Sequence, residues 1–350
     1  RLLRLHLITA RGIRWRMHRL VRDWAQRTGS ADEQAQARRS FVEGCAAYAQ
    51  RIELETGYQI YRDDGVHLEL AMGQAENVLG PGDSRLSQIF DRLGTALHSL
   101  GSFRTARELL EQALASALKN LGKDDPSVAT HRSNLAVVLQ DLGDLPRARE
   151  LLEQALASDL KNLGEDHPSV ATSRSNLATV LKDLGDLPRA RELLEQALAS
   201  NLKNLGEDHP SVATLRSNLA TVLTALGDLP RARELLEQAL TSALKNLGED
   251  HPSVATRGFN LAMIMKGSGD CDAAARMFVQ VLAADERILG PDDPSTSYTR
   301  VELAGCLAQL GRVEEARAQA QQALMAVSTQ PAGSTYRVQV ERAARKILDS

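Results

Sequence analysis

The chain has 350 residues, a formal net charge of −3 and only 3% aromatic residues. None of its apolar runs approaches the roughly 20 residues that a membrane-spanning helix needs, which argues against a membrane protein. Its three cysteines, Cys45, Cys271 and Cys306, share no motif spacing. This argues against a disulfide framework and a zinc site, and favours a reducing, cytoplasmic setting.

Residues 1–29 form a basic segment with eight arginines and one aspartate, a net charge of +7. Around Gly12 polar and apolar residues alternate as they do in a strand, and the following HRLVRDWAQR has a helical pattern. Arginines interrupt every apolar run, which argues against a signal peptide. The segment could be a solvated hairpin or arm, or part of a folded domain. A basic segment alone is only an electrostatic hint of nucleic-acid binding, which we do not expect.

His18, Arg19, Leu20 and Val21 carry a first resemblance. A strand that leads into an HRLV-type helix, directly before a repeat array, resembles the end of the winged-helix region in NB-ARC signalling ATPases of the STAND class. The chain also starts without methionine. The resemblance implies that this chain is the C-terminal part of a longer protein whose ATPase domain lies before residue 1.

Residues 30–83 are expected to be helical, as an N-terminal capping region or a degenerate repeat. The sequence ENVLGPGD at 76–83 is similar to the KNLGEDH that separates the later repeats. Terminal repeats of an array commonly diverge, because they cover the open end of its core.

The rest of the chain repeats itself every 42 residues. Residues 126–167 and 168–209 differ at only four of 42 positions, and residues 168–209 and 210–251 differ at five. Self-similarity at a fixed period indicates a solenoid, in which each repeat buries its apolar face against its neighbours. About six repeats span 84–335, and residues 336–350 are predicted to form a C-terminal capping helix. The repeats begin near Ser84, Pro126, Pro168, Pro210, Pro252 and Pro294.

Each repeat is predicted to contain two helices joined by short turns. In the repeat that starts at Pro168, apolar residues recur at steps of three and four in both halves. Asp166 is a candidate N-cap for the first helix, Pro168 suits its first turn, and Gly185 ends it. The second helix has Asp186 as a capping candidate and ends at Gly206.

Small residues are predicted where the two helices cross, at Ala178, Ala190 and Ala197. The central repeats also have NLA in the first helix, G-D-x-x-x-A at the turn and L-G-x-D-H-P between repeats. Together with the small residues, this pattern resembles the tetratricopeptide repeat in its 42-residue kinesin light chain form. The resemblance implies an all-α, right-handed superhelical α-solenoid of antiparallel helix pairs, with the first helix of each repeat on the concave face. Leucines replace residues that are often aromatic in that family, at Leu181, Leu187 and Leu194.

One histidine lies in each turn between the central repeats, at His167, His209 and His251. Adjacent turns in an array of paired helices lie roughly 10 Å apart, too far for two imidazoles to share one ion at about 2 Å. We therefore predict structural turn histidines, which could hydrogen-bond the neighbouring repeat, and neither a metal nor a cofactor.

An asparagine shared by the first helices is the best candidate for ligand contact. In tetratricopeptide proteins this residue often contacts the backbone of an extended peptide, and an amide can donate and accept hydrogen bonds at once. Alternatively, each amide could bond across to the neighbouring helix and set the repeat spacing. The candidate peptide-binding residues are Asn134, Asn176, Asn218 and Asn260, then Thr130, Thr172, Thr214 and Thr256 one turn earlier, and Thr179, Thr221 and Lys182.

The few differences between the central repeats also bear on the ligand. Substitutions at residues 137, 140 and 141 and at their counterparts lie near the same helix face as the asparagines. They could tune a ligand contact, or they could be free drift at exposed positions. Further differences fall at His131, Ser173 and Leu215, at Ala157, Ala199 and Thr241, and at Asp159, Asn201 and Ala243.

No phosphate-binding loop, nucleophile elbow or cluster of nucleophile and base is visible, so we do not expect this chain to be an enzyme. We predict a scaffold that binds a protein or an extended peptide. The two resemblances together favour the C-terminal sensor or regulatory region of a bacterial NB-ARC-like ATPase, with the ATPase domain as a partner in cis. The alternatives are a stand-alone adaptor of the kinesin light chain type, or a spacer that self-associates as an oligomerisation scaffold.

Overall fold

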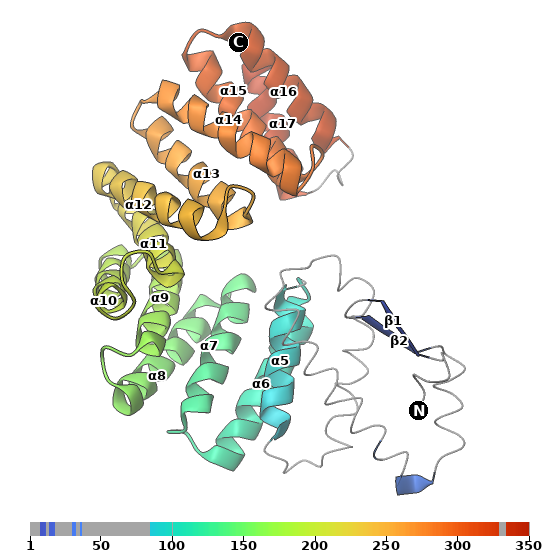
Figure 1. Cartoon of the computed structure of the whole chain (residues 1–350), viewed down its shortest axis with the longest axis vertical. Coiled ribbons are helices and arrows are strands. Elements are labelled where there is room, and N and C mark those ends of the chain that lie inside the picture. Colours follow the sequence, from blue (N-terminus) through green and yellow to red (C-terminus); the bar gives the residue numbers. More distant parts are fainter. Residues whose placement is uncertain are drawn as a thin grey trace. The chain divides into compact units, whose positions relative to one another are not determined.

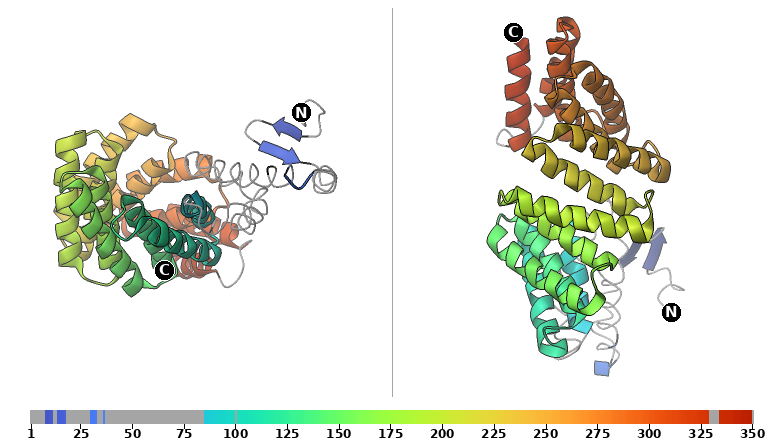
Figure 2. Two further views of the ribbon diagram at one scale, coloured as in Figure 1. Left: turned by 90° about the horizontal axis from the view of Figure 1, so that it is seen from below. Right: turned by 90° about the vertical axis from the view of Figure 1, so that its left-hand side faces the viewer.

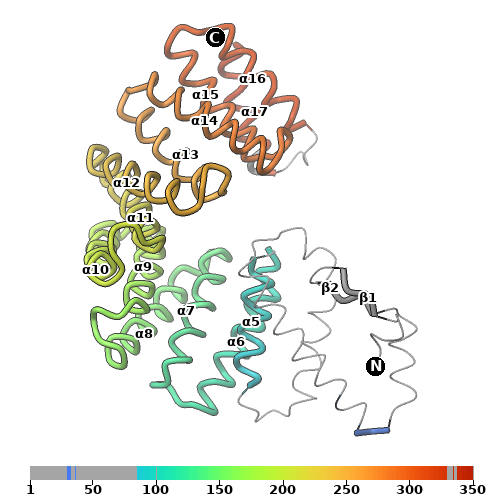
Figure 3. The backbone as a smooth tube through the Cα atoms, in the orientation of Figure 1, coloured from blue at the N-terminus to red at the C-terminus, as the bar shows by residue number. Residues whose placement is uncertain are grey.

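The computed structural model describes residues 8–11, 14–17, 30–32, 36, 85–99, 101–328 and 334–349. In this part of the chain thirteen α-helices with defined bounds follow two short strands (Figure 1). The chain divides into two compact units, residues 1–158 and 159–350, and the division falls inside helix α8. The succession of helices within each compact unit can be followed along the tube in Figure 3.

The two strands form a hairpin in the basic N-terminal segment. Strand β1, Ile8–Arg11, pairs antiparallel with strand β2, Arg14–Met17, and Ile8 lies opposite Met17. The strand-like alternation around Gly12 is therefore confirmed. The HRLV helix, most of residues 30–83 and Cys45 lie outside the described residues.

Two helices occupy each 42-residue repeat, as the sequence predicts. In the first compact unit these are α5 (Arg85–Ser99), α6 (Phe103–Leu121), α7 (Pro126–Asp141) and α8 (Leu145–Leu163). In the second they are α9 (Pro168–Asp183), α10 (Leu187–Leu205), α11 (Pro210–Leu226), α12 (Leu229–Leu247), α13 (Pro252–Gly267), α14 (Cys271–Ile288), α15 (Pro294–Gln309) and α16 (Val313–Val327), followed by α17 (Thr335–Leu348). We call the odd-numbered helices α5 to α15 first helices, and the even-numbered helices second helices.

The helices pack as consecutive pairs. In the second compact unit α9 packs on α10, α11 on α12, α13 on α14 and α15 on α16 (Figure 2). Within this unit the second helices α10, α12 and α14 also pack on the first helices of the following repeats, α11, α13 and α15. The all-α solenoid is therefore confirmed: each repeat completes its core with residues of its neighbours.

The last helix covers the end of the final helix pair. Helix α17 packs on α15 and α16, where Val340 and Ala344 are buried in a cluster that includes Val301 and Ala304. The amphipathic helix predicted at the C-terminal end of the chain is therefore present, and its apolar side closes the core.

The small residues predicted at the helix crossings are buried. Ala178, Ala190 and Ala197 are all inaccessible to solvent. At the equivalent of Ala178 in the crossing of α5 with α6 the chain has Gly94, where a Cβ would lie 2.7 Å from Cγ of Leu110. Close approach of the two helix backbones therefore requires a small side chain at this position.

Helix ends follow the predicted turn residues. Gly185 after α9 has φ of +86°, a left-handed conformation that glycine adopts without a Cβ penalty. Asp186 caps α10, because its carboxylate accepts a hydrogen bond from the N–H of Arg189 at 3.4 Å.

The predicted N-cap of the first helix is wrong by one residue. The cap of α9 is His167, whose Nδ1 accepts a hydrogen bond from the N–H of Ser169 at 3.2 Å. Because Pro168 is the first helical residue, the residue directly before it is placed to reach the second helical N–H. Asp166 lies too early for this contact and pairs with Lys203 Nζ at 2.7 Å instead.

The turn histidines are therefore structural, as predicted, but each bonds its own helix rather than the neighbouring repeat. His209 and His251 cap α11 and α13 in the same way. At the corresponding places Asp125 caps α7 and Asp293 caps α15. The same position therefore carries either of two residues that can accept a hydrogen bond.

Candidate peptide-binding surface

The first helices of neighbouring repeats lie side by side and are joined by the predicted asparagines. Asn218 Nδ2 on α11 donates to Ser175 Oγ on α9 at 3.1 Å. In the first compact unit Asn134 Nδ2 on α7 donates to both carboxylate oxygens of Asp91 on α5, at 3.1 and 3.0 Å. These bonds have the geometry of the structural alternative, in which each amide ties its helix to the preceding one. Asn176 and Asn260 are half-buried at the equivalent positions.

Other polar contacts join first helices further along the second compact unit. Arg257 Nη2 on α13 donates to Thr214 Oγ1 on α11 at 3.2 Å. Lys266 Nζ on α13 forms an ion pair with Glu302 on α15 at 2.6 Å. A side-chain bond of some kind therefore joins α9 to α11, α11 to α13 and α13 to α15, although the residue types change.

The predicted threonines present hydroxyl oxygens to solvent. Thr172, Thr214 and Thr256 are exposed, and each hydroxyl donates to the proline carbonyl four residues earlier, at 3.2, 3.2 and 3.0 Å. Thr179 and Thr221 bond back to the carbonyls of Ser175 and Ser217 in the same way. Because the hydroxyl proton is used within the helix, the oxygen is left to act as an acceptor.

The remaining two predictions are Thr130 and Lys182. Thr130 is exposed on α7 of the first compact unit. Lys182 at the end of α9 pairs with its neighbour Asp183 at 3.1 Å, so this part of the surface has a balanced charge. We call the exposed and half-exposed residues of α9, α11 and α13 at these positions the first-helix surface: Thr172, Asn176, Thr179, Lys182, Thr214, Asn218, Thr221, Thr256 and Asn260.

Sequence reasoning missed a buried polar contact between repeats. Ser173 Oγ on α9 donates to Asp159 Oδ2 at the end of α8, at 2.6 Å. Thr299 Oγ1 on α15 donates to Asp285 Oδ2 on α14 at 2.9 Å. Both pairs are buried and both join a second helix to the next first helix across 14 residues. We call positions related in this way seam pairs.

The seam pairs account for much of the variation between the central repeats. The other seam pairs are Ala117 with His131, Asn201 with Leu215, and Ala243 with Arg257. In the central repeats the residues at these two positions are buried, so their differences lie at packed contacts between repeats; Arg257, in the next repeat, is half-buried and reaches Thr214. Their signal in the sequence is that both members of a pair change together at a fixed separation of 14 residues.

The residue at a seam position decides which helix its side chain bonds, as His131 shows. Its ring is 3% exposed, and its Nδ1 lies 2.8 Å from Asp91 Oδ1, on the same carboxylate that accepts from Asn134. In the first compact unit one carboxylate on α5 therefore holds two side chains of α7. Serine at the equivalent position of α9 makes its bond to the preceding second helix instead.

Burial raises the pKa of the Asp159 carboxyl above its ordinary value of 3.8, while the hydrogen bond from Ser173 and the charge of His167 oppose the shift. The raised pKa means that the folded chain holds this proton more tightly than the unfolded chain. Asp159 therefore costs stability at pH values above its folded pKa, and this cost disappears below about 3.8.

We accordingly expect Asp159→Asn to stabilise the protein at pH 7, on the order of 1 kcal/mol, because the amide keeps an acceptor for Ser173 without a buried charge. Thermal unfolding followed by circular dichroism at several pH values would measure this. The gain over wild type should shrink as the pH falls below about 4. Asp292→Asn, in an exposed turn, is the control; a loss of stability at pH 7 specific to Asp159→Asn would contradict the expectation.

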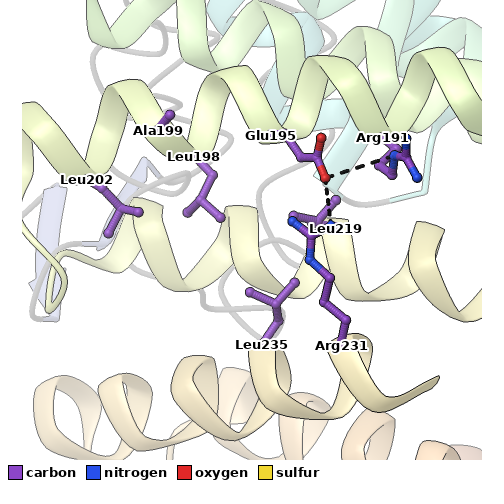
Figure 4. A pocket seen from close by; sticks show the side chains of 8 residues that line it. All are labelled: Arg191, Glu195, Leu198, Ala199, Leu202, Leu219, Arg231 and Leu235. Carbon is purple, nitrogen blue, oxygen red and sulfur yellow. Dashed lines mark ion pairs between the residues drawn. The ribbon is translucent and has the colours of Figure 1, made fainter. Parts of the chain in front are cut away.

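A shallow depression opens between second helices α10 and α12, with Leu219 of α11 at its floor (Figure 4). Its volume is about 580 Å³. Glu195 at its rim lies 3.0 Å from Arg231 Nη1 and 3.9 Å from Arg191 Nε. We call this the outer depression; its lining residues are Arg191, Glu195, Leu198, Ala199, Leu202, Leu219, Arg231 and Leu235.

Among the described residues no group of three histidine, cysteine, aspartate or glutamate side chains is placed to hold a metal ion. Over the same part of the chain, no helix combines the length and apolar character needed to cross a membrane.

Profiles of the tetratricopeptide repeat family match most of the helical array. One matches residues 127–203, 175–245, 211–287 and 260–326, and a second matches residues 87–127. No curated protein shows significant sequence similarity to the chain.

Solved structures share the fold. A Podospora anserina protein described as a kinesin light chain with nearly identical tetratricopeptide-like repeats is 34% identical, over 58% of this chain and 96% of its own, with a TM-score of 0.51. BtubC (BKLC) from P. vanneervenii is 24% identical, over 71% of this chain and 92% of its own, with a TM-score of 0.52. A Rap protein complexed with Competence and Sporulation Factor is 15% identical, over 94% of this chain and 90% of its own, with a TM-score of 0.62.

Proposed function

Because the chain belongs to the tetratricopeptide repeat family, we propose that it is a non-enzymatic scaffold that binds a protein or an extended peptide on its first-helix surface. The observation that carries the proposal is the row of exposed threonines Thr172, Thr214 and Thr256, one per repeat. Each hydroxyl donates its proton within its own helix, so its oxygen can act as an acceptor; the Thr214 oxygen already accepts one bond from Arg257 and has one further acceptor site. An extended peptide repeats its N–H groups along its length, so it matches a row of acceptors.

The charge of the surface supports a ligand that is recognised through its backbone. The threonines and asparagines are neutral, and the cation Lys182 is balanced by Asp183. The other cation beside these residues is Arg257, which already donates to Thr214. A strongly charged peptide would therefore find few opposite charges among the residues of this surface, and a terminal carboxylate would find no cluster of cations among them. The asparagines serve this surface indirectly, because Asn218 holds α11 at a fixed distance from α9 through Ser175.

For the wider setting, we propose the sensor or regulatory region of an NB-ARC-like ATPase in the cytoplasm, with the ATPase domain in cis. This rests on the sequence of residues 14–25. A stand-alone adaptor of the kinesin light chain type is the second candidate, and the 34% identity to the Podospora anserina protein favours it. Self-association as a spacer is the third, because nearly identical repeats offer nearly identical surfaces.

The test begins with partners captured from host lysate and identified, whose affinities for purified variants are then measured. Thr172→Ala, Thr214→Ala and Thr256→Ala together should weaken binding at least tenfold, since each removed contact is worth about 1 kcal/mol. Asn176→Ala with Asn218→Ala should also weaken it by loosening the spacing of the helices.

The matched control lies on the outer depression, where Arg191→Ala and Arg231→Ala remove exposed ion pairs that contribute little to stability. Binding that survives the threonine changes but is lost in this control would overturn the proposal and place the partner on the second helices. Concentration-dependent assembly without any partner would favour the spacer.

A further inference from the structure

Two buried thiols meet between the last two full helix pairs. Cys271 is the first residue of α14 and is 7% exposed, while Cys306 lies within α15 and is inaccessible to solvent. Neither forms a disulfide. Cys271 Sγ donates to Oε1 of Gln309 at 2.7 Å, and Gln309 lies one helical turn after Cys306 on α15. The two cysteines therefore lie at the same contact between α14 and α15, which pack against each other.

The fold does not require a thiol at either position. The residues equivalent to Cys271 in the preceding repeats are leucines, Leu187 and Leu229, and those equivalent to Cys306 are Val222 and Ile264. An apolar pair therefore occupies these two positions elsewhere in the same array. At this one contact both members have been replaced by cysteine, which is as apolar but can also be oxidised.

We propose that Cys271 and Cys306 are a redox-active pair that closes to a disulfide between α14 and α15 when a small disulfide, such as an oxidised cellular thiol, reaches Cys271. In the first step the Cys271 thiolate attacks one sulfur of the small disulfide, forms a mixed disulfide and expels one thiolate. In the second step the Cys306 thiolate attacks Cys271 Sγ and expels the other. The protein loses two electrons and two protons, and the small disulfide becomes two thiols.

The burial of the two thiols sets the order of these steps. Cys271 is the more accessible sulfur, so it meets the oxidant first. Burial raises the pKa of Cys306 to about 11; the positive charge of Lys266 opposes the shift, and Glu302 and Cys271 add to it. Cys306 is therefore protonated at neutral pH, and closure of the disulfide should be the slow step, faster as the pH rises toward 11.

Closing the disulfide would add a covalent bond to a contact between repeats that is otherwise held by packing and by hydrogen bonds such as that from Cys271 to Gln309. The bond would join residues 35 positions apart, so it would remove conformational freedom from the unfolded chain. Oxidation should therefore stiffen the C-terminal end of the array specifically, independently of what the first-helix surface binds.

The experiment treats the whole chain with oxidised glutathione under native conditions and follows the intact mass and the number of free thiols. We expect the loss of two hydrogen atoms without retained glutathione, a cross-linked peptide that contains Cys271 and Cys306, and one remaining thiol, Cys45. The Tm of the oxidised protein should exceed that of the reduced protein by about 4 °C or more, reversibly with a reductant. The rate of closure should rise with pH.

The control is Cys271→Leu with Cys306→Val, which restores the residues of a preceding repeat and should fold normally while showing neither the mass change nor the Tm shift. Cys45→Ser should leave both effects intact. A stable glutathione adduct on Cys271 without closure, a cross-link that involves Cys45, or a disulfide that forms only in denaturant would each overturn the proposal.

Discussion

Replacing Ala220 with leucine should lower the free energy of unfolding by about 3 kcal/mol. Ala220 is 0% exposed on α11, at the level where that helix meets Ala232 and Ala239 of α12, which are also fully buried. Three added carbon atoms at such a crossing must separate the helices or force strained rotamers. The equivalent Gly94 has no room even for a Cβ without movement of Leu110.

Thermal and urea unfolding of Ala220→Leu would measure this effect, and hydrogen exchange would locate it. Because contacts in a solenoid are made mainly between neighbours, protection should be lost around α11 and α12 first. Ala225→Leu is the matched control, since Ala225 is exposed near the end of the same helix and should change stability little. If both variants lost the same amount of stability, the effect of Ala220→Leu could not be assigned to the helix crossing, and the prediction would be wrong.

Replacing the three histidine caps with alanine together should lower the free energy of unfolding by nearly as much as Ala220→Leu. His167, His209 and His251 each accept a hydrogen bond from the second N–H of a first helix, at 3.2, 3.2 and 3.1 Å. Loss of an N-cap side chain costs about 1 kcal/mol, and the three caps lie on separate helices, so their effects should add to about 3 kcal/mol.

The matched variant changes the same three histidines to aspartate, the residue that caps α7 and α15 at this position. Aspartate should retain or raise the stability, because it keeps the acceptor and places a negative charge at a helix N-terminus. Thermal unfolding of the alanine and aspartate triple variants, followed by circular dichroism, would compare their stability with that of the wild type. If both lost stability equally, the histidines would act through contacts other than capping.

The sequence predicts the helices and their pairing well because these follow from short-range rules. Apolar steps of three and four, a proline at the first helical residue and a glycine such as Gly185 are enough to place both helices of a repeat. Residue type alone favours Asp166 as the N-cap, but the position directly before Pro168 gives this role to His167.

The contacts between repeats were harder to predict, because they depend on which side chains meet across two helices. The seam pair Asp159 with Ser173 joins residues of different repeats, and no local rule pairs them. The asparagines were identified from the sequence, but the bond from Asn218 to Ser175 depends on how far α11 lies from α9. Their role in ligand contact stays a prediction.

The seam pairs also bear on how the gene for such an array can change. Nearly identical tandem segments are prone to unequal recombination, which deletes or inserts whole copies. Loss of the copy that encodes residues 168–209 would bring Leu215 to the place of Ser173, beside Asp159. The carboxylate would then be buried against leucine without its hydroxyl donor, a cost of about 1–3 kcal/mol. A recombinant that shortens the array in this way would therefore be less stable, even if every remaining repeat were intact.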